Sequence, residues 1–282
     1  MLLAVLLSFA TAFCYGVSAA VHQRAAKRER PHAALDPRLL VRLFRNRLWL
    51  SGWLPDTAGA ALHATALRFG PLVLVQPVLA SGLFMAILIE AVLDRRRVLR
   101  RDAMAIGVGA TGLAAFLVVS DARAGVTDPS LSSWVWVGVG AGVAVAGCVL
   151  LSVRLRGAVR GAVLGVACGI AYSVAAALAK AVVGRYQGDL VPVLLDWRFA
   201  ALALVALLGL LLNQNAFQSG RLAAPLTALT LTDPVVSVVV GVTAFQETVS
   251  LGGIRLVGLG VSAVAILAGI WLAGTGSRQD RR

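Results

Sequence analysis

The chain has 282 residues, of which 59% are hydrophobic and 14% are charged. With a mean hydropathy of +0.85, this composition lies far outside that of soluble domains and predicts an integral membrane protein. The net charge of +13 does not indicate a nucleic-acid-binding surface, because the basic residues form short clusters between apolar runs. We therefore expect the lipid bilayer, and no nucleic acid, as the partner.

Nine apolar runs follow one another, each about as long as the roughly 20 residues that a spanning helix needs. They predict an all-α integral membrane fold with about nine transmembrane helices. The first run lacks the basic start of a secretory signal, so we expect it to be retained as a helix. The runs are Leu2–Val21, Leu48–Leu67, Pro71–Leu93, Ala103–Ser120, Ser133–Val153, Gly161–Gly184, Leu190–Asn213, Leu222–Phe245 and Gly252–Ala273.

The connections between the runs alternate in charge. The first, third, fifth and seventh connections contain eight, five, three and one basic residues, and the C-terminal tail contains three. Together they hold twenty of the 26 lysines and arginines. Because such loops stay in the cytoplasm, we expect a multi-pass protein of the cytoplasmic membrane with the N-terminus outside and the C-terminus inside. The other side keeps only Arg68, Arg123, Arg185, Arg198 and Arg255.

Two pairs of segments resemble each other. ALHATALRFGPL, from residue 61, matches LLNQNAFQSGRL at an offset of 150, and QPVLASGLFMAILIE, from residue 76, matches DPVVSVVVGVTAFQE at an offset of 157. Five runs separate equivalent positions, so the copies would have opposite orientations, as in inverted-topology repeats. Helices 1–4 and 6–9 would form the repeats, with helix 5 as a linker. We expect a first repeat over 1–120 with a basic cytoplasmic loop at 22–47, a linker helix and loop over 121–160, a second repeat over 161–274 and a basic tail over 275–282.

GPLVLVQPVLASGLFMAILIE and DPVVSVVVGVTAFQE resemble paired helices of the drug/metabolite transporter superfamily, in which a proline and small residues precede an apolar run that ends in glutamate. The nine-helix count, outside N-terminus and basic first loop are more similar to the EamA-like, NIPA-type branch, associated with magnesium, than to the ten-helix exporters. The resemblance implies transport by alternating access. One departure is Asp233, where family members often have Asn or Glu; the first copy has Gln76.

Asp233 lies in the middle of its run, where a charge costs at least about 2.5 kcal/mol on insertion scales. Pro234 lacks an N–H and leaves the Thr230 carbonyl without its helical partner, while Thr230 and Ser237 share the helix face of Asp233. The group suits a cation, a proton or a substrate amine. The alternative is a neutral, hydrogen-bonded acid at a packing kink.

The first half has a counterpart in Asp56 and His63, which lie seven residues apart on one helix face. They form either a proton relay or a carboxylate beside a histidine that hydrogen-bonds a neighbouring helix. We expect Asp56 and Asp233 to line one water-accessible cavity. The predicted substrate- or ion-binding residues are Asp56, His63, Gln76, Asn213, Thr230, Asp233 and Ser237, with helix breaks at Pro55, Pro77 and Pro234.

Other polar and small residues have structural interpretations. Tyr172 either lines the same cavity or packs with a satisfied hydroxyl. Lys180 is expected to reach the outer membrane surface, and Glu247 to mark the membrane boundary or pair with Arg255. The cysteines, Cys14, Cys148 and Cys168, lack metal-ligand spacing. The glycines Gly161, Gly165 and Gly169, and likewise Gly138 and Gly142, are expected to form helix-packing faces.

No G-x-S-x-G, H-E-x-x-H or Walker A lysine occurs in the sequence, so we expect neither an enzyme nor a cofactor. The sequence favours a secondary transporter, or permease, for a small solute or cation. Its substrate would be magnesium or another divalent cation, or a small amine or metabolite coupled to protons. A non-transporting membrane scaffold or lipid-interacting subunit is the alternative, and either protein could be a homodimer.

Overall fold

The computed structural model describes residues 1–28, 47–93, 95, 97–98, 100–189, 191–217, 223–249 and 253–276. Within these ranges the regular structure is helical, apart from an antiparallel bridge between Arg123 and Thr248. The all-α prediction is confirmed. The helices are α1 (Leu2–Arg28), α3 (Arg47–Phe69), α4 (Leu72–Leu79), α5 (Gly82–Leu93), α6 (Arg100–Val119), α7 (Leu131–Arg154), α8 (Gly157–Gly184), α9 (Val191–Leu194), α10 (Trp197–Phe217), α11 (Ala223–Thr243) and α12 (Ile254–Gly276).

Seven segments of the described chain are long and apolar enough to cross a membrane, so the fold is that of a multi-pass membrane protein. Besides the four-residue α9, two longer helices of the described chain fall short of that length or hydropathy. α10 is apolar only over Trp197–Asn213, and α3 includes Asp56 and His63. The seven segments are Leu2–Val21, Leu72–Leu93, Asp102–Val119, Leu131–Arg154, Gly157–Gly184, Pro225–Thr243 and Ile254–Leu272.

One predicted run is divided into two helices. The run from Pro71 to Leu93 forms α4 and α5, which are separated by a turn at Ala80 and Ser81. The Ser81 N–H and hydroxyl both donate to the Val78 carbonyl, at 3.0 and 2.6 Å. These bonds satisfy an acceptor that the interrupted helix leaves free.

Of the three helix breaks predicted at prolines, two do not occur in the structure. Pro55 and Pro234 lie inside the continuous helices α3 and α11, so the breaks predicted there are wrong. A proline removes one backbone donor, and the remaining hydrogen bonds of these long helices keep them continuous. After Pro77 the helix does end, two residues later at Leu79.

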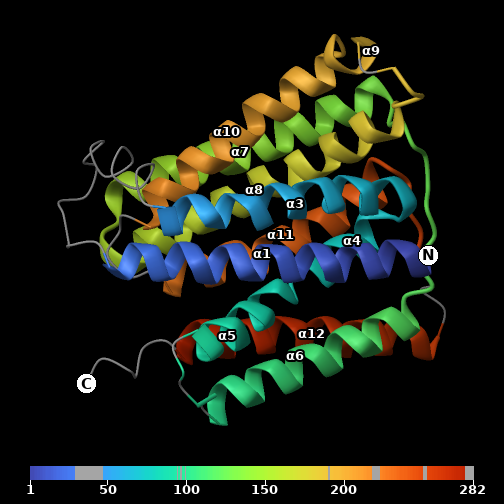
Figure 1. Cartoon of the computed structure of the whole chain (residues 1–282). Helices are drawn as coiled ribbons and strands as arrows, with labels where there is room; N and C mark the ends of the chain where they lie inside the picture. The colour runs from blue at the N-terminus through green and yellow to red at the C-terminus, as the bar shows by residue number, and fades with distance from the viewer. Residues whose placement is uncertain are drawn as a thin grey trace.

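The long helices run back and forth between two ends of the bundle (Figure 1). We call one the Met1 end; it also contains Phe69 and the connections 120–130, 185–189 and 244–249. The opposite end, which contains Leu93, Arg97 and Arg154, is the Arg97 end. The predicted loop at 22–47 lies mostly outside the described residues, as does the tail.

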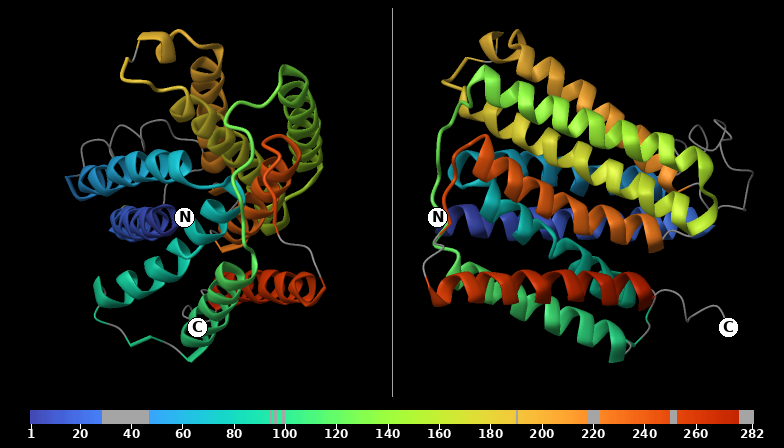
Figure 2. Two further views of the ribbon diagram at one scale, coloured as in Figure 1. Left: turned by 90° about the vertical axis from the view of Figure 1, so that its right-hand side faces the viewer. Right: turned by 180° about the vertical axis from the view of Figure 1, so that it is seen from behind.

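The long helices pack in groups of two or three. α1 packs on α3 and α5, α8 packs on α10 and α11, and α6 packs on α12 (Figure 2). α4 and α11 contact each other between these groups. α8 is buried along most of its length, so the second half of the chain supplies the centre of the bundle.

Glycines explain the closest helix contacts. A Cβ added at Gly165 would lie 2.4 Å from the Pro225 carbonyl oxygen, and one at Gly169 would lie 2.8 Å from the Thr232 Cβ. The predicted packing face is therefore confirmed at these two positions of α8. At Gly138 and Gly142 no such contact forms within the described chain, because α7 lies at the edge of the bundle and no described atom lies within 4 Å of their Cβ positions.

Candidate functional site

Asp233 lies on α11 beside the close contact between Gly169 of α8 and Thr232. Its Oδ1 accepts hydrogen bonds from Ser173 of α8 at 2.9 Å and from Ser237 at 3.4 Å. The side chain is half-buried, and no described lysine or arginine pairs with it. Ser237 thus joins Asp233 as predicted. The Thr230 hydroxyl instead donates to the Leu226 carbonyl of its own helix at 2.8 Å.

On α3, Asp56 and His63 have different partners. The Asp56 Oδ1 accepts a bond from Ser18 of α1 at 3.3 Å. The His63 Nε2 lies 3.3 Å from the Gln76 Nε2 of α4, and its ring meets the Tyr15 ring edge-on, with the centroids 6.3 Å apart. No direct hydrogen bond joins Asp56 to His63, so a relay between them would need a bridging group.

Tyr15 of α1 connects the two halves of the candidate site. It contacts His63 and lies within electrostatic range of both Asp56 and Asp233. These two carboxylates are far apart in the sequence and come from α3 and α11. Both predicted acids therefore lie within electrostatic range of one aromatic side chain, and sequence analysis did not identify Tyr15.

Tyr172 of α8 occupies a similar position on the other side of the cluster. Its side chain lies near Cys168 and Asn213, with Asp56 within electrostatic range, and the Cys168 Sγ donates to the Gly209 carbonyl at 3.3 Å. Thus Asn213 also joins the site, whereas the side chain of its neighbour Gln214 is not described. We call the assembly of Tyr15, Asp56, His63, Gln76, Tyr172, Asn213 and Asp233 the midplane cluster.

Two glycines let the tyrosines pack against the neighbouring helices. A Cβ at Gly59 of α3 would lie 2.8 Å from the Tyr15 ring, and a Cβ at Gly209 of α10 would lie 2.6 Å from the Tyr172 ring. Any larger residue would displace the ring. Each tyrosine is therefore fixed by a glycine on the helix that also supplies His63 or Asn213.

Two polar atoms of the midplane cluster have no hydrogen-bond partner. Gln76 is only 2% exposed, and its Oε1 is unsatisfied, as is the Oδ1 of Asn213. Buried acceptors without partners are uncommon and costly. Among the described residues, no group of three or more His, Cys, Asp or Glu side chains could ligate a metal.

A second polar group, near the Met1 end, corrects two expectations. Lys180 does not extend to the membrane surface: it is buried and pairs with Glu247. The Glu247 carboxylate also accepts bonds from the backbone N–H groups of Leu72 and Val73, at 2.7 and 2.8 Å. Glu247 thus neutralises the N-terminus of α4, and Arg255, its expected partner, lies 3.5 Å from Asp121 instead.

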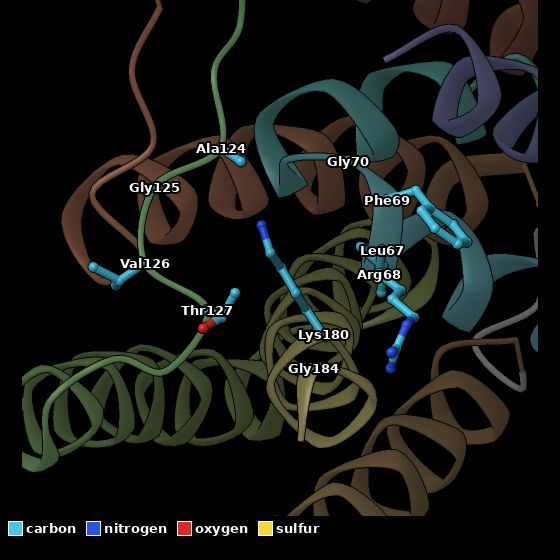
Figure 3. Close-up of a pocket in the computed structure, with 10 residues that line it drawn as sticks. All are labelled: Leu67, Arg68, Phe69, Gly70, Ala124, Gly125, Val126, Thr127, Lys180 and Gly184. Atoms are coloured by element: carbon cyan, nitrogen blue, oxygen red, sulfur yellow. The ribbon is translucent and has the colours of Figure 1, made fainter. Parts of the chain in front are cut away.

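A small pocket of about 90 Å³ adjoins this group (Figure 3). Leu67–Gly70 and Ala124–Thr127 line it, and the Lys180 side chain extends between these two segments. The volume holds about three water molecules. We therefore assign no substrate to this pocket.

The five arginines that sequence analysis assigned to the outer side all lie at the Met1 end. Arg68 donates to the carbonyls of Val183 and Tyr186 at 2.8 and 3.0 Å. The other four contact carboxylates: Arg123 and Arg255 with Asp121, and Arg185 and Arg198 with Asp128 and Asp196. These contacts neutralise most of the positive charge at this end.

Asp196 makes this network sensitive to pH. Burial alone would raise the pKa of Asp196, but hydrogen bonds from Arg198 and the charges of Arg198 and Arg185 lower that pKa below its ordinary value of 3.8. Because the folded state favours the ionised carboxylate, Asp196 stabilises the protein at pH values above the pKa that this carboxyl has in the unfolded chain. This stabilisation is lost as the pH falls through its pKa in the folded protein. We expect thermal stability in detergent to fall below about pH 4, with a smaller fall in Asp196→Asn. Equal falls in both proteins would contradict this assignment.

Comparison with known proteins gives one relevant similarity and no assigned function. No protein-family model and no solved structure matches the chain. The chain is 28% identical over 268 residues to an uncharacterized protein of Corynebacterium glutamicum, and the match covers 94% of this chain and 92% of the relative. The similarity therefore extends over both halves of the bundle.

Proposed function

We propose that this chain is a secondary transporter of the drug/metabolite type that moves a small solute across the cytoplasmic membrane by alternating access. The observation that best supports it is the midplane cluster, in which Asp56 and Asp233 come from opposite halves of the chain and both lie near Tyr15. Acids in membrane helices are costly, and they mark substrate or ion pathways. A scaffold or lipid-interacting subunit has no need of two such acids.

The positions of the cluster residues support an inverted repeat of nine transmembrane helices. Tyr15 and Tyr172 are separated by 157 residues, as are Gln76 and Asp233, while Gly59 and Gly209 are separated by 150, as are His63 and Asn213. The offsets equal those of the two sequence matches. The helix contacts are consistent with this relation, since α1 packs on α3 as α8 packs on α10.

In such a transporter, the two halves rock about a site between them. α4 and α11, which supply Gln76 and Asp233, contact each other, so motion of one half against the other would change the cluster directly. A hydrated chamber or a bound cation would relieve the cost of both acids. Proton coupling would use the same carboxylates.

The test is solute flux in proteoliposomes that contain the purified full-length chain. Uptake of amines, metabolites and divalent cations is compared with empty vesicles, with and without a pH gradient. A saturable, protein-dependent flux of any of these solutes supports a transporter. No flux above the empty vesicles, with correctly inserted protein, would favour the scaffold.

The proposed orientation predicts which loops face the cytoplasm. Starting from a variant in which Cys14, Cys148 and Cys168 are replaced by serine, a cysteine is introduced at Arg97 or at the exposed Arg123. We expect an impermeant maleimide to label the cysteine at 123 in intact cells and that at 97 only after permeabilisation, because the basic loop stays inside. The reverse labelling pattern would invert the topology.

A further inference from the structure

The midplane cluster contains hydrogen-bond acceptors that its own donors leave unsatisfied. Ionised Asp56 and Asp233 only accept, and the Oε1 of Gln76 and the Oδ1 of Asn213 have no partner. No described lysine or arginine forms an ion pair with either acid, and Lys180 is engaged by Glu247. The cluster therefore keeps two unsatisfied acceptors beside two carboxylates, and no described lysine or arginine neutralises those carboxylates.

The buried amide of Gln76 points into this cluster. Its Nε2 faces His63 at 3.3 Å, and His63 contacts Tyr15, which lies near both acids. With the Nε2 as the donor, the bond fixes the amide so that its oxygen stays available. A ligand N–H would satisfy this oxygen and remove the cost of an unpaired buried acceptor.

The two tyrosines of the cluster, Tyr15 and Tyr172, add a second preference. Both tyrosines lie within electrostatic range of Asp56, and each ring packs against a glycine on the adjacent helix. An ammonium group beside a carboxylate and over an aromatic face gains from both contacts. A magnesium ion instead needs near-octahedral oxygen ligands and retains several waters, so it would use the acids but neither ring.

We infer that the midplane cluster binds a protonated primary amine with an apolar body, and that this organic cation is the class of substrate transported. The inference rests on the proposed function for its transport step. The ammonium group of the bound amine would donate to Asp56, Asp233 and the free amide oxygens, while the tyrosine rings flank the charge. Anions are excluded, because the two carboxylates would repel them.

Binding is tested on the purified full-length protein in detergent, by calorimetric titration and by the shift of thermal unfolding. The probes are benzylammonium, neutral benzyl alcohol, benzyltrimethylammonium and magnesium chloride. We expect saturable binding of benzylammonium, about 10-fold tighter than that of the trimethyl ion, which has no N–H donor. Equal binding of benzyl alcohol, or stabilisation by magnesium alone, would overturn the proposal.

Three variants assign the contacts. Gln76→Leu is expected to weaken benzylammonium binding about 10-fold and to leave benzyltrimethylammonium unchanged, because only the former donates to the amide oxygen. Tyr15→Phe keeps the ring and should retain most of the affinity, whereas Tyr15→Leu should lose about 5- to 30-fold. If Gln76→Leu weakens both ions equally, or if Tyr15→Leu binds as tightly as Tyr15→Phe, the assignment fails.

The binding and flux experiments separate the two proposals. Benzylammonium binding without flux would refute transport and leave the binding site. Flux of magnesium or of another solute without benzylammonium binding would refute the substrate class and leave the transporter. Thermal unfolding of each variant without ligand shows whether it is folded.

Discussion

Asp233→Asn is expected to reduce protein-dependent flux at least about 10-fold, since it removes the charge of a hydrogen-bonded carboxylate from the site. The geometry supports a loss of this size because Ser173 and Ser237 fix the carboxylate. Expression and membrane insertion should be unchanged, because the substitution lowers the cost of placing this residue at the midplane. Flux in proteoliposomes and the amount of protein in the membrane are measured together.

The matched control is Asp189→Asn, which removes an exposed carboxylate from the Met1 end. Asp189 accepts a bond from the Val191 N–H at the start of the short helix α9, and it has no contact with the midplane cluster. We expect this variant to retain flux. Normal flux in Asp233→Asn would make Asp233 a structural acid and remove it from the site.

Lys180→Met is expected to be the most destabilising single change at the Met1 end. It leaves the Glu247 carboxylate buried without its cation, and breaking a buried ion pair in this way costs about 3–5 kcal/mol. The N–H groups of Leu72 and Val73 still bond to the carboxylate, so the cost should fall at the lower part of that range. Thermal or denaturant unfolding in detergent measures it.

The double variant Lys180→Met/Glu247→Gln is the control for this prediction. A neutral glutamine leaves no unpaired buried charge and can still accept through its amide oxygen, so the double variant should be more stable than Lys180→Met. Together with the single variant Glu247→Gln it completes a double-mutant cycle, in which the departure of the unfolding free energies from additivity gives the coupling between the two residues. Additive effects of the two substitutions would mean that the Lys180–Glu247 pair contributes little.

Much of the fold could be predicted because the bilayer limits the choices. Apolar runs of spanning length become helices, since no other open structure satisfies its backbone in lipid. The break between α4 and α5 was missed because hydropathy stays high across Ala80 and Ser81 and gives no boundary signal. Pro55 and Pro234 were overinterpreted, because a single lost hydrogen bond does not end a long helix.

Sequence predicted those residues of the candidate site whose insertion into a membrane helix costs free energy regardless of their partners. Asp56 and Asp233 were identified from the expense of an acid in a membrane helix. Ser173 gave no signal, because serine is common in membrane helices and its role depends on the crossing of α8 and α11. Tyr15 had a signal that was not used, since it lies 157 residues before Tyr172, at the offset of the repeat.

The sequence-based interpretation placed Lys180 and Glu247 each at the membrane surface nearest to it. It did not consider that the two side chains could pair with each other. They are 67 residues apart in sequence, and both were expected near the outer surface. A neighbouring helix supplied a closer partner than the solvent did. Depth along a helix predicts which residues share a level, but only the packing of α8 against the segment after α11 determines which of them meet.

The bonds between Glu247 and the start of α4 have a consequence for sequence variation. The first half contributes only main-chain N–H groups, from Leu72 and Val73, and every residue except proline has such a group. Substitution at these two buried positions is therefore limited by side-chain size, whereas replacement of Glu247 removes the acceptor itself. Homologous chains can vary at 72 and 73 among apolar residues of similar volume and still keep this connection between their halves.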